Sequence, residues 1–204
     1  MSARIAVLDY GMGNLHSVSR ALVRVGAVVC VTPDPVEVER ADALVIPGVG
    51  HFGACMRALR DVGLEEQTRA FIAGGRPVVG VCVGMQILFE GSDEGPELGL
   101  GVLDGRVERL PDSAKIPHMG WNTVAWTGRR HPYTAGIPDG TSFYFVHSYA
   151  PGVDERTVGV SDHGRTFAAA VAWNNVFATQ FHPEKSGEAG LQLYENVVRA
   201  VSAA

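Results

Sequence analysis

The first half of the chain alternates apolar runs of strand length with segments of helical periodicity, and this order limits the fold more than any other feature. We expect strands at 4–9, 27–32, 43–46 and 77–81. A helix is expected over 15–25, after Asn14 as a candidate N-cap and before Gly26, because apolar residues recur there every three or four positions. A strand–helix–strand order of this kind predicts a parallel sheet covered by helices on both faces.

The pattern changes after Glu90. We expect a polar, glycine-rich loop over 91–99, and then short strand-like runs at 101–110, 141–149 and 166–181. Asn174-Asn175 predicts a hairpin turn within the last run, and a helix is expected over 186–201. We therefore expect one α/β domain over residues 1–204, with a mostly parallel, flavodoxin-like central sheet flanked by helices and antiparallel strands in the second half.

Cys82 directly follows the fourth expected strand, in the run Gly80-Val81-Cys82-Val83-Gly84. This run has the Gly-x-nucleophile-x-Gly pattern of a nucleophile elbow, with cysteine in place of serine. The glycines fit a sharp, strained turn, in which side chains would collide with the strand and with the helix expected over 85–89. Such a turn leaves the thiol at a helix N-terminus, which favours a thiolate. The alternative for Cys82 is a small buried hydrophobic residue, which is how we interpret Cys30 and Cys55.

A candidate base lies far downstream, in the run Phe181-His182-Pro183-Glu184. We expect a strand over 176–181 that ends at His182, so that the period of two in extended chain places His182 and Glu184 on the same side. The carboxylate would then orient the imidazole and stabilise its charged form, while the imidazole takes the thiol proton and passes it to a leaving amine. The His-x-Glu spacing also suits a metal ion, but no further ligands stand at metal-site spacing.

The third expected strand is followed by Pro47-Gly48-Val49-Gly50. Glycines just past a strand let backbone N–H groups approach a substrate closely. Ligands of α/β sheets bind outside the carboxyl ends of the strands, where this loop and the Cys82 turn would both lie. The N–H of Val83 and an N–H from Val49 or Gly50 would then stabilise a developing oxyanion. Taken alone, the loop is equally typical of an ordinary turn.

With these motifs the chain resembles the class I (triad) glutamine amidotransferases, and most closely the glutaminase subunits of imidazole glycerol phosphate synthase. The Cys and His-Pro-Glu elements are those of the whole superfamily. The segments that carry the resemblance span nearly the whole chain: Asp9-Tyr10-Gly11-Met12-Gly13-Asn14, Pro47-Gly48-Val49-Gly50-His51-Phe52, Gly80-Val81-Cys82-Val83-Gly84-Met85-Gln86, Pro117-His118-Met119-Gly120-Trp121-Asn122, Tyr144-Phe145-Val146-His147-Ser148-Tyr149 and Phe181-His182-Pro183-Glu184-Lys185-Ser186. Val83 departs from the leucine usual in relatives, with little consequence expected because the role belongs to its backbone N–H.

The resemblance implies hydrolysis of glutamine to glutamate and ammonia by a triad of Cys82, His182 and Glu184, with no cofactor and no metal. The residues implied to hold the glutamine are Gly50, Gln86, Ser148 and Tyr149. The resemblance also implies a heterodimer with a (β/α)₈-barrel cyclase of histidine biosynthesis. That partner would receive the ammonia through a tunnel and make imidazole glycerol phosphate and an aminoimidazole carboxamide ribonucleotide. The residues implied to lie in segments facing the partner are Trp121, Asn122, Tyr144 and Lys185.

Bulk properties agree with this interpretation. The formal net charge of -5 gives no electrostatic reason to expect nucleic acid as a partner. Three cysteines at unrelated spacings do not form a disulfide framework, which fits a reducing cytoplasm. We expect no signal peptide and no membrane span. Two alternatives stay open: a glutaminase subunit that feeds another synthase, such as pyridoxal phosphate synthase, and a non-catalytic interaction module of the same fold.

Overall fold

The computed structural model describes residues 2–129 and 131–203. Over these residues, five parallel strands form one half of a nine-stranded sheet, in the order β2 (Val28–Thr32), β1 (Arg4–Leu8), β3 (Ala43–Gly48), β4 (Val78–Cys82) and β13 (Val176–Thr179). Strands β3, β4 and β13 are buried along their whole length, as expected where helices cover both faces. The α/β fold class is confirmed, since the strands predicted in the first half all lie in this parallel part.

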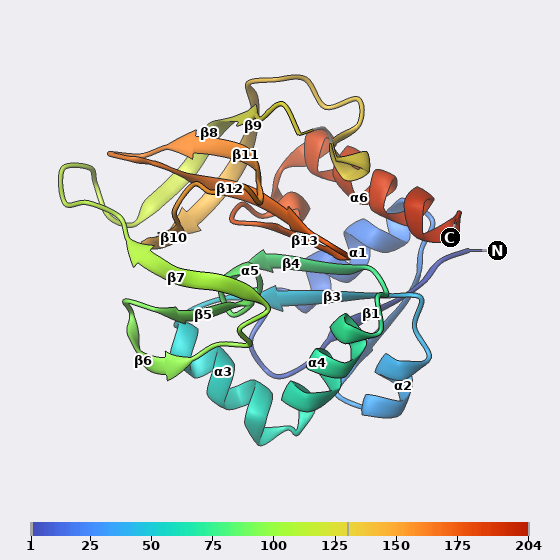
Figure 1. The fold of residues 1–204 in the computed structure, drawn as a ribbon. Helices are drawn as coiled ribbons and strands as arrows, with labels where there is room; N and C mark the ends of the chain where they lie inside the picture. The colour runs from blue at the N-terminus through green and yellow to red at the C-terminus, as the bar shows by residue number, and fades with distance from the viewer. Residues whose placement is uncertain (1, 130, 204) are drawn as a thin grey trace.

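Helices cover both faces of the parallel strands (Figure 1). On one face lie α2 (Pro35–Glu39), α3 (Phe52–Asp61) and α4 (Leu64–Ala73), and on the other α1 (Leu15–Arg24) packs beside α6 (Gly187–Ser202). Helix α1 begins after Asn14 as expected, although the Asn14 side chain makes no capping hydrogen bond. A short 3₁₀ turn, η1 (Pro132–Thr134), packs against α6, where Asn196 donates to the Tyr133 carbonyl at 3.0 Å. Within the described ranges, no helix has the length and apolar character needed to cross a membrane.

The second half of the chain extends the same sheet with antiparallel strands, in the order β12 (Thr166–Trp173), β11 (Thr157–Asp162), β8 (His118–Trp126) and β9 (Thr141–His147). The predicted hairpin between β12 and β13 turns at Asn174, whose φ is 51°. The sequence did not predict β8 or β11. The first half of strand β8 exposes the apolar Met119 and Trp121 and buries His118, which is the reverse of the alternation in an ordinary half-buried strand.

The prediction of a polar loop over 91–99 was wrong. The chain there forms β5 (Phe89–Ser92) and β6 (Gly95–Leu98), which join β7 (Leu103–Arg109) and β10 (Tyr149–Pro151) in a second sheet of order β10-β7-β5-β6. The strands are short and one face is partly exposed. Their polar side chains therefore do not give the apolar alternation by which a strand is recognised in a sequence. The helix expected over 85–89 is correspondingly shorter, since α5 (Val83–Gln86) ends before the chain enters β5.

Candidate active site

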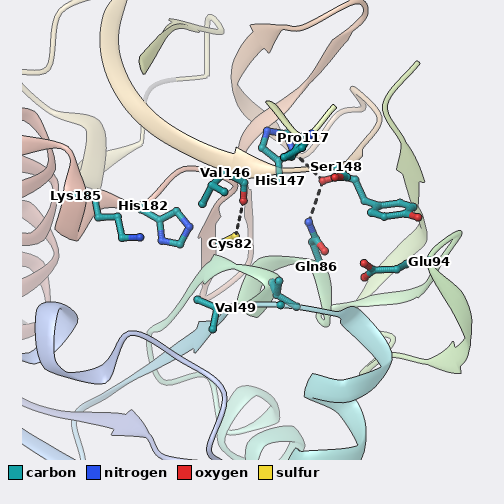
Figure 2. A pocket seen from close by; sticks show the side chains of 13 residues that line it. Val49, Cys82, Gln86, Glu94, Pro117, Val146, His147, Ser148, His182 and Lys185 are labelled. Carbon is teal, nitrogen blue, oxygen red and sulfur yellow. Dashed lines mark hydrogen bonds between the residues drawn. The ribbon is translucent and has the colours of Figure 1, made fainter. Parts of the chain in front are cut away.

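The predicted catalytic segments follow three neighbouring parallel strands and lie at one edge of the large sheet. Gly48 at the end of β3 pairs with Cys82 at the end of β4, and Thr179 at the end of β13 pairs with Val81. Because adjacent parallel strands end at the same edge, the Pro47–Gly50 loop, the cysteine and the histidine meet there. They line a cavity of about 370 Å³. Figure 2 shows Cys82 in the middle of it, with His182 to one side and Gln86 to the other.

Cys82 occupies a strained turn. Its φ of 55° and ψ of -114° lie in a region that residues with a side chain rarely adopt. The turn is tight because α5 packs directly on β3: a Cβ atom at Gly84 would overlap the carbonyl oxygen of Ile46, and one at Gly48 would overlap the Gly84 nitrogen. The Gly-x-Cys-x-Gly pattern therefore produces the sharp elbow expected from sequence, with the thiol at the start of α5.

His182 and Glu184 form a buried pair. His182 Nδ1 lies 2.8 Å from Glu184 Oε1, and their side chains are only 2% and 1% exposed. The expected extended geometry was wrong, because Pro183 begins a 3₁₀ turn, η2 (Pro183–Lys185), and the turn rather than a strand returns Glu184 to the ring. The histidine backbone is fixed by its N–H to the Tyr144 carbonyl at 2.9 Å, and by Ser186 Oγ, which donates to its carbonyl at 2.6 Å.

The second ring nitrogen of His182 faces the thiol. Within the described residues Nε2 has no hydrogen-bond partner, and it is buried in the cavity that also contains Cys82. Burial lowers the pKa of His182, but its interactions with Cys82 and Glu184 outweigh burial and raise that pKa to about 10. The ring is therefore suited to take a proton and to hold it. Among the residues that the structure describes, no three histidine, cysteine or acidic side chains are grouped as a metal site would require.

Gln180 is a further residue of this site that sequence analysis missed. Its side chain is fully buried, and its Nε2 donates to Cys82 Sγ at 3.7 Å. Its Oε1 accepts from Gln86 Nε2 at 3.1 Å, and the same Gln86 nitrogen donates to the Tyr149 carbonyl at 2.9 Å. The sequence offered one signal for Gln180: it lies two residues before His182, and in the strand expected there this spacing places both side chains on the same side. The Cys82 thiol lies 3.8 Å from the Val146 carbonyl oxygen (Figure 2).

Comparison with known proteins agrees with this geometry. The family model described as glutamine amidotransferase class-I matches residues 6–201. The chain belongs to this family. It is 48% identical over 202 residues to imidazole glycerol phosphate synthase subunit HisH of Symbiobacterium thermophilum, a match that covers 98% of this chain and 95% of the relative. The HisH subunit of Chromobacterium violaceum is 49% identical over 205 residues, with 95% and 96% covered.

Solved structures share the fold of this amidotransferase. A chain in the structure of PurLQS from Thermotoga maritima superposes with a TM-score of 0.77 at 20% identity, covering 98% of this chain and 99% of that one. At that level of identity the likeness concerns the fold alone.

The structure brings the predicted oxyanion and glutamine-binding residues of this amidotransferase into one cavity. It is lined by Val49, Gly50, Val83, Gln86, Ser148 and Tyr149 together with Cys82 and His182. Further lining residues that we did not predict are Glu94, Pro117, Val146 and His147. Glu94 was missed because it lies in the segment that we interpreted as a loop. Ser148 links β9 of the large sheet to β10 of the small one.

The residues expected to face a partner divide into two groups. Trp121 and Tyr144 are cross-strand neighbours on β8 and β9 with ring centroids 6.1 Å apart, and Lys185 Nζ lies 5.7 Å from the centre of the Tyr144 ring. Trp121 is 60% exposed and Lys185 is also exposed. Asn122 projects from the opposite face of β8, since side chains alternate along a strand, and its amide bonds His118 and the Asp162 carbonyl.

Proposed function

We propose that this chain is the glutaminase subunit of an imidazole glycerol phosphate synthase and hydrolyses glutamine to glutamate and ammonia. One observation carries the proposal: a cysteine on a strained elbow shares a cavity with a histidine whose other ring nitrogen is bound by a buried carboxylate. This is the arrangement of a nucleophile, a base and an orienting group. The match to HisH subunits over nearly the whole chain supports the choice of synthase.

The cavity has two ends that suit the two ends of glutamine. Figure 2 shows Glu94 on the far side of Gln86 from Cys82. Its carboxylate would attract the α-ammonium of glutamine, while the side-chain amide reaches Cys82. Gly50, Gln86, Ser148 and Tyr149 line the cavity together with these residues and would hold the rest of the substrate. Oriented binding of this kind is a large part of catalysis, because it removes the entropy cost of bringing the amide to the nucleophile.

The reaction then follows from the atoms that line the cavity. The thiol proton of Cys82 passes to His182 Nε2, whose raised pKa favours holding it, and Cys82 Sγ then attacks the carboxamide carbon. The oxyanion that forms would accept hydrogen bonds from the N–H of Val83 and from that of Val49 or Gly50, and one such donor is typically worth about a hundred- to a thousandfold in rate. His182 returns the proton to the departing nitrogen, and ammonia leaves a glutamyl thioester on Cys82. Water, deprotonated by His182, attacks the thioester to give glutamate and the free thiol.

The proposed partner is a (β/α)₈-barrel cyclase that forms a heterodimer with this chain and consumes the ammonia. Ammonia released into water is protonated and diluted, so confinement between subunits would preserve it. Trp121, Tyr144 and Lys185 lie together on one exposed face, and the two aromatic rings are of the kind that is enriched at interfaces. Asn122 is not part of this proposed surface, because its amide is bound within the chain.

The test is a Cys82→Ala exchange in the complex with the cyclase. Synthesis from glutamine should be lost, while synthesis from added ammonium should persist, because the variant removes only amide cleavage. Cys30→Ala is the matched control, since Cys30 lies on β2 and does not line the cavity, and it should retain both activities. Loss of both activities in Cys82→Ala would mean that the residue serves folding or docking, and would refute the proposed role.

A further inference from the structure

Two histidines that the reaction does not use lie beside the cavity. His118 on β8 and His147 at the end of β9 are cross-strand neighbours, and only 4% and 6% of their surfaces are exposed. His147 lines the cavity. The ring of His118 stacks on Phe145 and on His163, with centroid distances of 4.9 and 4.2 Å. His118 Nδ1 and His147 Nε2 are 2.9 Å apart, so the two imidazoles share a hydrogen bond.

The direction of that hydrogen bond is fixed from both ends. His147 Nδ1 lies 2.9 Å from the Tyr149 carbonyl oxygen, which can only accept, so Nδ1 carries the proton. In a neutral ring Nε2 must then accept, and His118 donates to it from Nδ1. At the other end, Asn122 Oδ1 accepts from the Thr123 N–H at 2.8 Å, which turns its amide nitrogen to His118 Nε2 at 3.2 Å. Both ends require the same tautomers.

The surroundings keep both rings neutral. Burial lowers the pKa of His118 to about 4, and the neighbouring His163 adds to the effect. Burial also lowers the pKa of His147 to about 3 despite its bond to the Tyr149 carbonyl, with His118, His163 and His182 contributing in the same direction. At neutral pH neither ring therefore carries the charge that would disrupt the directed hydrogen bonds.

The Tyr149 carbonyl connects this pair to the substrate-binding glutamine. It accepts from His147 Nδ1 and also from Gln86 Nε2, at 2.9 Å each. The second hydrogen of Gln86 Nε2 goes to Gln180 Oε1 at 3.1 Å, so both hydrogens of that amide are used. The Gln86 side chain is thereby held with its nitrogen toward the protein, and its oxygen is left to accept a hydrogen bond from the substrate.

We propose that His118 and His147 are positioning residues for glutamine binding, which hold the Tyr149 carbonyl and through it the orientation of the Gln86 amide. This inference rests on the proposed glutaminase function and deepens it. Neither histidine touches the reacting atoms in this scheme, so their loss should raise the KM for glutamine more than it lowers kcat.

Two variants of His118 separate hydrogen bonding from packing. His118→Phe keeps a ring that can stack on Phe145, but it leaves His147 Nε2 as a buried acceptor without a donor. His118→Asn loses the stacked ring but places an amide nitrogen where Nδ1 stands. Glutaminase kinetics are measured in the complex with the cyclase, and synthesis from ammonium reports folding and docking. His131→Asn is the matched control, because His131 is a histidine in an aromatic stack that does not line the cavity.

We expect His118→Phe to raise the KM for glutamine about tenfold, within the roughly five- to hundredfold effect of an unsatisfied buried acceptor. His118→Asn should recover most of the affinity, and His131→Asn should match the wild type. The opposite order, with Phe tolerated and Asn impaired, would show that packing alone matters and would overturn the inference. A wild-type complex without glutaminase activity would refute the proposed function itself, which distinguishes the two failures.

The tautomers can be measured without any variant or activity. Nitrogen-15 spectra of the histidine-labelled complex distinguish protonated from unprotonated ring nitrogens. We expect Nδ1 to be protonated and Nε2 unprotonated in both His118 and His147 at pH 7. A proton on Nε2 of His147, or a charged ring in either residue, would overturn the inference even if His118→Phe failed to fold.

Discussion

The strained elbow predicts that activity at Cys82 is maintained at the expense of stability. A residue with a side chain at a φ of 55° and a ψ of -114° costs about 1–3 kcal/mol relative to relaxed backbone, whereas glycine adopts positive φ readily. Glycine ordinarily costs about 0.5–1 kcal/mol more conformational entropy on folding than alanine. The difference leaves Cys82→Gly more stable than Cys82→Ala by about 1 kcal/mol, the reverse of the usual order.

Comparing these two variants isolates the backbone, because both lack the thiol and neither should hydrolyse glutamine. Urea unfolding of the purified chain gives the free energy of unfolding for each, and thermal unfolding should show Cys82→Gly melting about 2–4 °C higher. Ala43→Gly on β3 is the matched control, since the backbone of Ala43 lies in an ordinary strand, and the exchange should destabilise by about 0.5–1 kcal/mol. If Cys82→Gly is less stable than Cys82→Ala, the elbow is not strained and the reasoning fails.

Three further perturbations test other parts of the site and the core. Gly84→Ala should lower the free energy of unfolding by about 1–3 kcal/mol and abolish glutaminase activity, because its Cβ would overlap the Ile46 carbonyl; unchanged urea unfolding would contradict this. Glu184→Gln should lower the pKa of His182 from about 10 and reduce kcat at least tenfold, which a pH profile of kcat would reveal. Burial lowers the pKa of His131 to about 4, below its unfolded value of about 6.5, so the unfolded state binds more protons between those values and stability falls as the pH drops. His131→Asn should therefore lessen the loss of stability between pH 7 and pH 5 by less than about 1.4 kcal/mol per pH unit, because solvent screens a half-buried ring, and an unchanged loss would contradict a neutral ring in the folded state.

The features that sequence predicted correctly are those that local sterics determine. The parallel strands are short runs buried on both faces, so their apolar character is continuous and easily recognised. Gly80 and Gly84 flank Cys82 because neighbouring backbone leaves no space for a Cβ at either position. The spacing of these two glycines around Cys82 follows directly from that lack of space, so the sequence alone predicts the elbow.

The features that were missed depend on tertiary contacts. Strand β8 was overlooked because it buries His118 against another histidine and exposes Trp121. Its order of polar and apolar residues therefore reflects contacts near the cavity and an exposed surface rather than the hydrophobic core. The turn at Pro183 was expected to be extended, but the fixed φ of proline starts a 3₁₀ turn that sequence periodicity does not represent. The role of Gln180 could be recognised only from the structure, in which its side chain bonds that of Gln86.

The placement of Ser148 between β9 of the large sheet and β10 of the small sheet has a consequence for how substrate binding in such an enzyme can change. Cys82 ends β4 and His182 lies just beyond the end of β13, the neighbouring strand of the large sheet, while Tyr149 already belongs to the small sheet. The nucleophile and the base thus depend on the large sheet, whereas Tyr149, one of the residues proposed to hold the substrate, depends on the small sheet. Substitutions within β7 or β10 are therefore expected to change how Tyr149 contacts the amino acid more than they change the placement of Cys82 and His182.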